Sequence, residues 1–162
     1  HWNQFGAYIA YLEIIKILSK EHPLLSPYSQ DTIDFTETQS TMGLANMIEA
    51  TYLTEQKTVR EKNPEFVKSI IISEPSNGYH ETAWIPNSQA PSALVYHDSF
   101  WYFNLNDYLM LSFSKTNFIH FESTQYLNSK TVEYFQPDII IIEIVERNLQ
   151  NLPVILSLLI SE

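Results

Sequence analysis

The sequence predicts an α/β protein, arranged as a three-layer α/β/α sandwich around a mostly parallel central sheet. Two observations carry this prediction. From residue 92 onward, short strand-like segments alternate with helix-like segments, as in parallel strands joined by crossover helices. In addition, residues 138–145 (DIIIIEIV) form an almost unbroken apolar run, which is typical of a parallel strand covered on both faces.

The first half of the chain contains one clear helix and weaker strand patterns. Residues 3–20 place apolar side chains at helical spacing, and the prolines that follow end the helix. Residues 31–39 alternate weakly and residues 65–74 are rich in isoleucine, so both segments are predicted strands. Between them, residues 40–52 read as a loop followed by a short helix. An Asn-Gly pair at 77–78 indicates a turn.

The second half is more regular. The predicted elements alternate, with a strand at 93–97, a helix at 99–114, a strand at 117–121, a helix at 124–136 and a strand at 138–145. A proline after residue 136 ends the second of these helices. The sequence shows neither an internal repeat nor a linker, so we expect a single domain over residues 1–162.

Composition and charge narrow the function classes. The net charge is −10, from nine Lys and Arg against nineteen Asp and Glu, which disfavours nucleic acid and anionic lipid as partners. The absence of cysteine excludes disulfides and thiolate metal sites. Nucleotide-binding glycine motifs and the H-E-x-x-H zinc motif are absent as well, so we expect neither cofactor nor metal. No apolar run reaches the roughly 18 residues of a membrane span.

A candidate nucleophile stands directly after the predicted strand 93–97. Ser99 follows Asp98 at the carboxyl end of that strand, where open α/β sheets hold their functional crevice. It also begins a predicted helix, whose free N–H groups favour an oxyanion of acyl transfer. A plain helix-capping role would equally explain a serine at this position.

A serine nucleophile needs a neighbouring base. Of the five histidines, His97 lies two residues before Ser99 and is predicted to be a polar residue at the strand end. His120 is expected to satisfy a local hydrogen bond, and two others lie near proline and turn signals, where exposure is expected. This leaves His1, which precedes the first helix, as the candidate base.

Three segments together resemble a known family. HWNQFGAYIAY (1–11), ALVYHDSF (93–100) and PDIIIIEIVERNL (137–149) follow one another as in the alginate O-acetyltransferase type of SGNH-hydrolase-like proteins, the DHHW group. That group is described by a D-x-H-W-N motif followed by Gly-Ala. The resemblance spans essentially the whole chain and implies a flavodoxin-like, SGNH-like fold.

The resemblance implies roles for individual residues. Ser99 would be the nucleophile and His1 the base, oriented by an Asp two residues before His1, outside the numbered chain. The chain, which opens without Met, is therefore expected to be an N-terminally truncated part of a longer one. The oxyanion would be held by the Ser99 N–H with Gly43 and Asn46, which could also be a turn glycine and a water-facing helix residue. The family's glycine before Asp-Ser is replaced by His97.

Two further residues are candidates for substrate contact. Arg147 could bind a substrate group, or form a structural ion pair with Glu146 or Glu143. Trp2 could stack on a sugar ring, or pack the first helix against the sheet.

The function implied by the resemblance is serine-dependent O-acetyl transfer to or from a bacterial cell-surface polysaccharide such as alginate. The implied partners are that polysaccharide and a membrane-bound protein that supplies acetyl groups, in the periplasm or outside the cell. Two alternatives remain open: a carbohydrate acetylesterase with water as acceptor, and a non-catalytic domain that binds a glycan or a partner enzyme.

Overall fold

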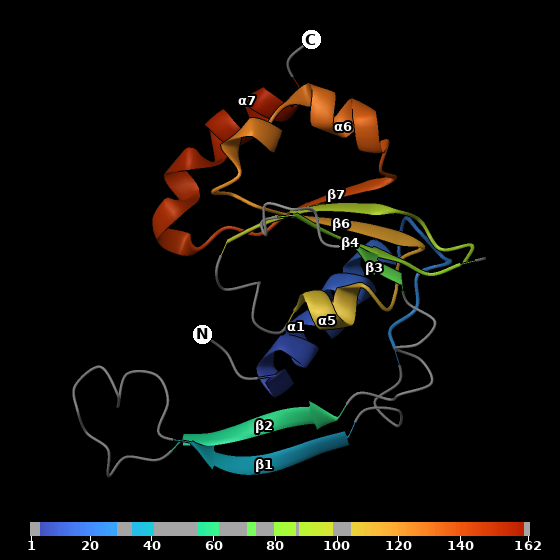
Figure 1. Cartoon of the computed structure of the whole chain (residues 1–162), viewed down its shortest axis with the longest axis vertical. Coiled ribbons are helices and arrows are strands. Elements are labelled where there is room, and N and C mark those ends of the chain that lie inside the picture. The colour runs from blue at the N-terminus through green and yellow to red at the C-terminus, as the bar shows by residue number, and fades with distance from the viewer. Residues whose placement is uncertain are drawn as a thin grey trace.

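The computed structural model describes residues 4–28, 34–40, 55–61, 71–73, 80–86, 88–98 and 105–160. In this part of the chain a five-stranded sheet lies between two helical layers, with α1 and α5 on one face and α6 and α7 on the other (Figure 1). The predicted three-layer α/β/α sandwich is therefore confirmed.

The helical segments comprise four α-helices and two 3₁₀ turns in the described residues: α1 (Gln4–Leu18), α5 (Asn106–Leu109), η2 (Thr124–Tyr126), α6 (Ser129–Phe135), η3 (Glu146–Asn151) and α7 (Leu152–Ile160). The strands are β1 (Asp34–Ser40), β2 (Glu55–Glu61), β3 (Ile71–Ser73), β4 (His80–Trp84), β5 (Ala93–His97), β6 (Lys115–His120) and β7 (Ile139–Ile142). Among the described residues, no helix is long and apolar enough to cross a membrane.

The central sheet has the strand order β3-β4-β6-β5-β7. β5 pairs in parallel with both β6 and β7, whereas β4 runs antiparallel to β3 and β6. Register aligns His97 with His120 and Tyr96 with Ile142. The carboxyl ends of β5, β6 and β7 therefore meet at one edge of the sheet.

The strand predicted at 31–39 is present as β1, but it does not belong to the central sheet. It pairs antiparallel with β2, with Asp34 opposite Glu61, and this ribbon lies beyond α1 (Figure 1). The prediction did not include β2, whose sequence EQKTVRE is polar and lacks an apolar run. Pairing between strands this far apart in sequence is not visible in local periodicity.

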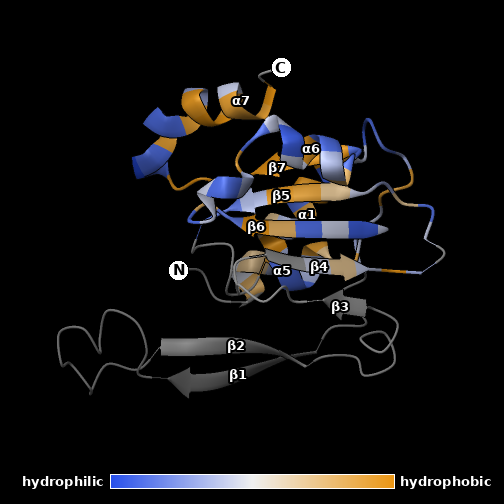
Figure 2. Ribbon diagram, turned by 45° about the horizontal axis from the view of Figure 1, so that its top comes forward, coloured by the Kyte–Doolittle hydropathy of each residue, from blue (hydrophilic) through white to orange (hydrophobic). Residues whose placement is uncertain are grey.

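Alternating residues of β5 fill the two cores. Ala93 and Val95 pack on the side of α1 and α5, whereas Leu94 and Tyr96 pack on the side of α6 and α7. All four are fully buried, and the strand is uniformly apolar in Figure 2 until its carboxyl end. Burial on both faces explains why the sequence of β5 does not alternate between apolar and polar residues.

The helix predicted at 99–114 is much shorter where it is described. Hydrogen bonds to other parts of the chain stabilise a different backbone conformation after Leu109. α5 ends at Leu109, and Ser112 N donates to Leu109 O (3.0 Å) in a tighter turn. The Ser112 hydroxyl bonds the hydroxyl of Tyr11 on α1 (2.6 Å) and the carbonyl of Ser26 (3.1 Å). These two bonds hold residues 110–114 against α1 instead of extending the helix.

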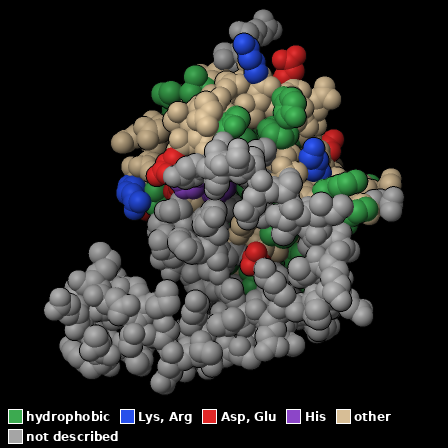
Figure 3. Space-filling view, viewed as in Figure 1, with side chains coloured by type: hydrophobic (Ala, Val, Ile, Leu, Met, Phe, Trp, Pro, Cys, Tyr) green, Lys and Arg blue, Asp and Glu red, His purple; other side chains and the backbone are tan. Residues whose placement is uncertain are grey.

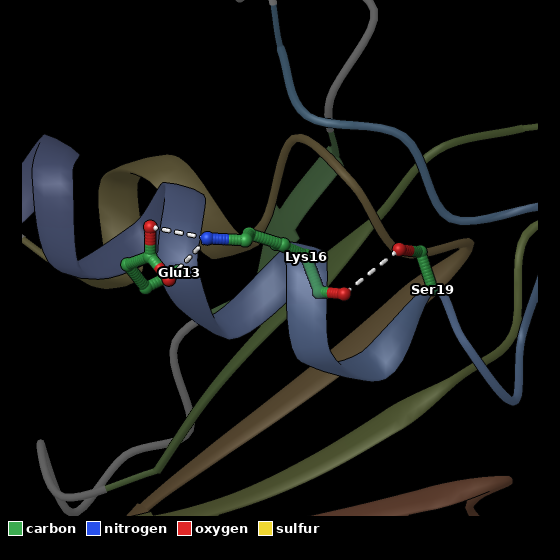
Figure 4. A network of polar contacts seen from close by, with 3 residues as sticks. All are labelled: Glu13, Lys16 and Ser19. Atoms are coloured by element: carbon green, nitrogen blue, oxygen red, sulfur yellow. Dashed lines mark hydrogen bonds and ion pairs between the residues drawn. The ribbon is translucent and has the colours of Figure 1, made fainter.

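The outer face of α1 is exposed and mixes apolar side chains, Ile9 and Ile17 among them, with an ion pair. Lys16 Nζ lies 3.0 Å from both carboxylate oxygens of Glu13, and Ser19 Oγ donates to the carbonyl of Lys16 (3.2 Å; Figure 4). An exposed pair of this kind stabilises a helix by only about 0.3–0.5 kcal/mol. The position of α1 is thus set by its buried face, where Tyr8 and Tyr11 pack on Tyr108 of α5.

Candidate active site at the carboxyl ends of the parallel strands

The carboxyl edge of the sheet gathers ionisable side chains from three neighbouring strands. Asp98 directly follows β5, His120 ends β6, and Glu143 directly follows β7. Histidine atoms reach the surface near an acidic side chain on the face drawn in Figure 3. Because these strands are parallel neighbours, their sequence-distant ends lie side by side, as expected for the crevice of an open α/β sheet.

Two hydrogen bonds join Asp98 to the segment after β7, one to Glu143 and one to Val145, and together we call them the Asp98–Glu143 clasp. The backbone N–H of Asp98 donates to Glu143 Oε2 (3.0 Å). In return, the carboxylate oxygen Oδ2 of Asp98 accepts from the backbone N–H of Val145 (2.9 Å). A further backbone bond, from Glu143 N to Tyr96 O (2.9 Å), continues the pairing of β5 with β7. The residue before Ser99 is therefore tied to the chain after β7 on two sides.

The pKa of Glu143 is raised to about 7, from an ordinary value of 4.5, mainly because burial penalises the charged carboxylate. The hydrogen bond from the Asp98 N–H acts in the opposite direction and lowers this pKa. The negative charge and the side chain of Asp98 raise it further. Glu143 therefore keeps its proton up to about neutral pH.

His97 is the polar strand-end residue that the sequence predicts, since it is the last residue of β5, and it is buried, with 3% of its surface exposed. Burial lowers its pKa to about 4, and the charge of His120 lowers it further, against the opposing effects of the Asp98 carbonyl and carboxylate. Its Nδ1–H donates to the carbonyl oxygen of Asp98 (3.0 Å). The imidazole is thus neutral near pH 7, and it supports the backbone of Asp98 from the side.

His120 satisfies a local hydrogen bond, as predicted. Its Nδ1 accepts from the backbone N–H of Glu122 (3.1 Å) and lies 4.0 Å from a carboxylate oxygen of the same residue. The rings of His120 and His97 meet edge to face, with centroids 5.3 Å apart. His120 thereby forms the outer neighbour of the buried imidazole.

Most of the residues assigned from the sequence lie outside the described residues: His1, Trp2, Gly43, Asn46 and Ser99. Arg147 is described, and it lies exposed in η3, five residues beyond the end of β7. The strand predicted to reach residue 145 ends at Ile142. In the described part of the chain Arg147 forms no ion pair, and Glu143, one of its expected partners, bonds the Asp98 N–H instead.

Sequence reasoning did not single out Glu143. The signal available was one acidic residue inside the apolar run IIIIEIV (139–145). A lone carboxylate inside such a run needs a hydrogen-bond partner, and parallel strand ends meet at one edge. Together these two facts would have directed attention to Asp98, the acidic residue at the end of the neighbouring strand.

Two open cavities lie at the opposite edge of the sheet. One of about 390 Å³ is lined by His22, Pro91 and Asp138, among others, and a second of about 310 Å³ by Ile85 and Ser112 among others. Pro91 and Asp138 precede β5 and β7, which places the larger cavity at the amino edge. The ionisable groups gather at the carboxyl edge, so the candidate site is placed by its chemistry and not by these cavities.

The described residues offer an acid–base pair and hydrogen bonds, but no metal cage. Within the part of the chain that is described, no three His, Asp or Glu side chains are arranged to hold a metal ion. What the edge does supply is a hydrogen-bonded backbone at residue 98, the neutral imidazole of His97 beside it, and Glu143, whose pKa is raised mainly by burial. Such an arrangement can hold an adjoining side chain in one orientation.

No family model matches the sequence, and no curated protein matches it significantly. Several solved structures, however, match the fold of this chain. PatB1 of Bacillus cereus, determined with a sulfonyl adduct, has a TM-score of 0.66 at 16% identity, over 92% of this chain and 58% of its own. A second PatB1 structure has a TM-score of 0.64 at 15% identity, over 92% of this chain and 61% of its own.

A DHHW family protein from Eubacterium siraeum has a TM-score of 0.66 at 12% identity, over 100% of this chain and 63% of its own. The chain thus spans about three fifths of the length of these neighbours. At identities this low, the TM-scores show similarity of fold alone. The sandwich described above is accordingly a fold shared with PatB1 and with a DHHW family protein.

Proposed function

We propose that this chain carries out serine-dependent acyl transfer, moving O-acetyl groups to or from a polysaccharide. The observation that carries the proposal is the position of Asp98 at the carboxyl edge between β6 and β7, because Ser99 is the next residue. The likeness to PatB1 with a sulfonyl adduct supports it, since sulfonyl adducts form on activated nucleophiles such as a serine hydroxyl.

The proposed reaction has two balanced halves. Ser99 Oγ attacks the carbonyl carbon of an acetyl ester while His1 takes the hydroxyl proton. The tetrahedral intermediate expels the donor alcohol, which receives that proton, and acetyl-serine remains. A sugar hydroxyl then attacks the acetyl-serine, loses its proton to His1 and leaves as the acetylated product, while Ser99 regains its proton.

The remaining residues would bind and orient. An Asp upstream of His1 would hold the imidazole, and the Ser99 N–H with Gly43 and Asn46 would stabilise the oxyanion. Arg147 and Trp2 would contact the glycan. The proposal also includes a membrane-bound partner that supplies acetyl groups, and a site of action outside the cytoplasm.

The first test is hydrolysis of an activated acetyl ester by the protein and by Ser99→Ala. We expect the substitution to lower kcat by about a thousandfold or more, because it removes the nucleophile. Ser157→Ala is the matched control, since Ser157 is exposed on α7 and its hydroxyl donates only to Val154 O (2.7 Å) among the described bonds. Equal activity of Ser99→Ala and the control would refute the proposal.

A product analysis separates transferase from esterase. With a soluble oligosaccharide present, a transferase yields acetylated sugar by mass spectrometry, whereas an esterase yields acetate alone. Glycan binding without turnover, and without labelling of Ser99 by a sulfonyl fluoride, would favour the non-catalytic binding domain.

A further inference from the structure

The Asp98–Glu143 clasp is more elaborate than the pairing of two strand ends requires. β5 and β7 are already joined by their ladder and by the bond from Glu143 N to Tyr96 O. The two side-chain bonds of the clasp are additional to this pairing, and both converge on residue 98. They fix the backbone and the side chain of Asp98 at the same time.

We propose that Glu143 is a positioning residue, which acts through Asp98 to orient Ser99. This inference rests on the proposed function. It assigns Glu143 a role that is exerted through the backbone of Asp98.

The geometric argument starts from the covalent link between residues 98 and 99. Adjacent Cα atoms are about 3.8 Å apart, so the direction in which residue 98 ends decides where residue 99 begins. Glu143 Oε2 holds the N–H of Asp98, and Val145 N–H holds its carboxylate. His97 Nδ1–H holds the carbonyl of the same residue. With an N–H, a carbonyl and a side chain all bonded, residue 98 has little freedom.

The precision of this placement matters for the reaction. A displacement of about 1 Å at a reacting group can lower a rate about a hundredfold. Loss of the clasp would free Asp98, and with it the start of residue 99. We therefore expect the effect in kcat, because substrate binding depends on other residues.

The charges that face Glu143 give its placement a pH dependence. Burial and the negative charge of Asp98 keep the proton on Glu143, although the hydrogen bond from the Asp98 N–H favours the ionised form. Behind Asp98 lie His97, which is neutral near pH 7, and His120, which faces His97. Loss of the proton from Glu143 places a second negative charge beside Asp98 in a partly buried position, and we expect the repulsion to displace Asp98.

The decisive experiment is the pH dependence of kcat for the wild-type protein and Glu143→Gln. In the wild type we expect a bell: activity rises as the base loses its proton near its ordinary pKa of about 6.5 and falls as Glu143 ionises. Glutamine keeps an oxygen for the Asp98 N–H and offers an N–H to the Asp98 carboxylate at every pH. Glu143→Gln should therefore keep kcat at pH 6 within about threefold and lose the alkaline fall.

Glu143→Ala tests the geometry, with Glu133→Gln as the charge-matched control on the exposed face of α6. We expect Glu143→Ala to lower kcat about tenfold or more with KM within about threefold, and Glu133→Gln to match the wild type. Rates are referred to the folded fraction measured by circular dichroism, and if Glu143→Ala does not fold, Glu143→Gln decides alone.

The outcomes distinguish this inference from the proposed function. An unchanged alkaline limb in Glu143→Gln, together with an inactive Ser99→Ala, would overturn the role of Glu143 and leave acyl transfer standing. An active Ser99→Ala would overturn both. A purely structural role of Glu143 predicts lower folded yield with an unaltered pH profile, and that result would also overturn the inference.

Discussion

His97 is a buried polar side chain that does not change its protonation state near neutral pH. Its ring lies under the Asp98 backbone, donates one N–H to the Asp98 carbonyl, and meets Phe118 and His120 edge to face. Because burial disfavours the charged imidazolium, the ring stays neutral throughout the range where a catalytic histidine would titrate. His97 is therefore suited to support the backbone of Asp98 and not to exchange protons near neutral pH.

The titration of His97 is directly measurable by NMR of its ring protons. We expect a midpoint near pH 4, because burial lowers its pKa from 6.5 to about 4. The His97→Gln variant identifies the signal by its disappearance. A midpoint near 6.5 would show that water or the Asp98 carboxylate reaches the ring, and would contradict the assignment of His97 as a neutral support.

The sequence predicts which edge carries the site, but not how its side chains meet. The position of Asp98 at a strand end follows from the apolar run ALVYH and the polar pair after it. The contact of Asp98 with Glu143 spans 45 residues and depends on β7 lying beside β5 instead of β6. Local periodicity contains no information about that choice of neighbour, so the clasp could not be derived from it.

At the scale of elements, α6 shows how local signals fix both ends of a short helix. Asn128 is its N-cap, and its Oδ1 accepts from Thr131 N (2.9 Å), while its Nδ2 donates to Gln125 O (2.6 Å). At the other end Gln136 is left-handed (φ 45°), and Pro137 follows. A helix of seven residues has few internal bonds, so these ends carry much of its stability.

Asn128→Ala should lower the free energy of unfolding by about 1–2 kcal/mol, because Thr131 N–H loses its acceptor at the helix start. Asn128→Asp keeps the acceptor and should lie within about 0.5 kcal/mol of the wild type. Urea unfolding followed by circular dichroism measures both variants. Equal losses in the two would mean that the bond to Gln125 O, and not the cap, is the important contact.

An element can be predicted from the sequence when its own residues determine it, and cannot when its pairing with another strand determines it. β5 is predicted to the residue, since four of its five buried residues form one continuous apolar run, which His97 ends. The predicted helix 124–136 is interrupted, because Asn128 caps a new helix after η2. β4 joins the sheet antiparallel between β3 and β6, although its sequence HETAW lacks a strong strand pattern. Its place is decided by pairing with buried β6.

For the whole molecule, opposite edges of one sheet have different character. The amino edge carries open cavities and a carboxylate, Asp138, whose pKa is lowered by hydrogen bonds from the Ser92 N–H and hydroxyl. The carboxyl edge carries Glu143 and His97, which are both shifted toward their neutral forms mainly by burial. At the edge where we propose that the reaction takes place, Glu143 and His97 are thus polar groups that favour their neutral, hydrogen-bonded forms.

These two groups give the stability of the protein a defined pH dependence. Glu143 binds its proton more tightly when folded, so its contribution is complete below pH 4.5 and is lost as pH rises to about 7. His97 binds its proton less tightly when folded, so its contribution is complete above pH 6.5 and is lost as pH falls to about 4. Between pH 4.5 and 6.5 the two slopes oppose each other, and stability from these groups should be nearly flat.

Glu143→Gln should remove the alkaline loss while leaving the acid loss of His97 in place. After allowance for the part of the Glu143 carboxyl that water reaches, we expect the variant to gain about 1–2 kcal/mol over the wild type at pH 8 and nearly nothing at pH 4. Urea unfolding at several pH values measures this difference, with Glu133→Gln as control for the general effect of removing one charge from an acidic protein. Parallel curves for wild type and Glu143→Gln would show that the folded Glu143 carboxyl has its ordinary proton affinity, and would contradict its raised pKa.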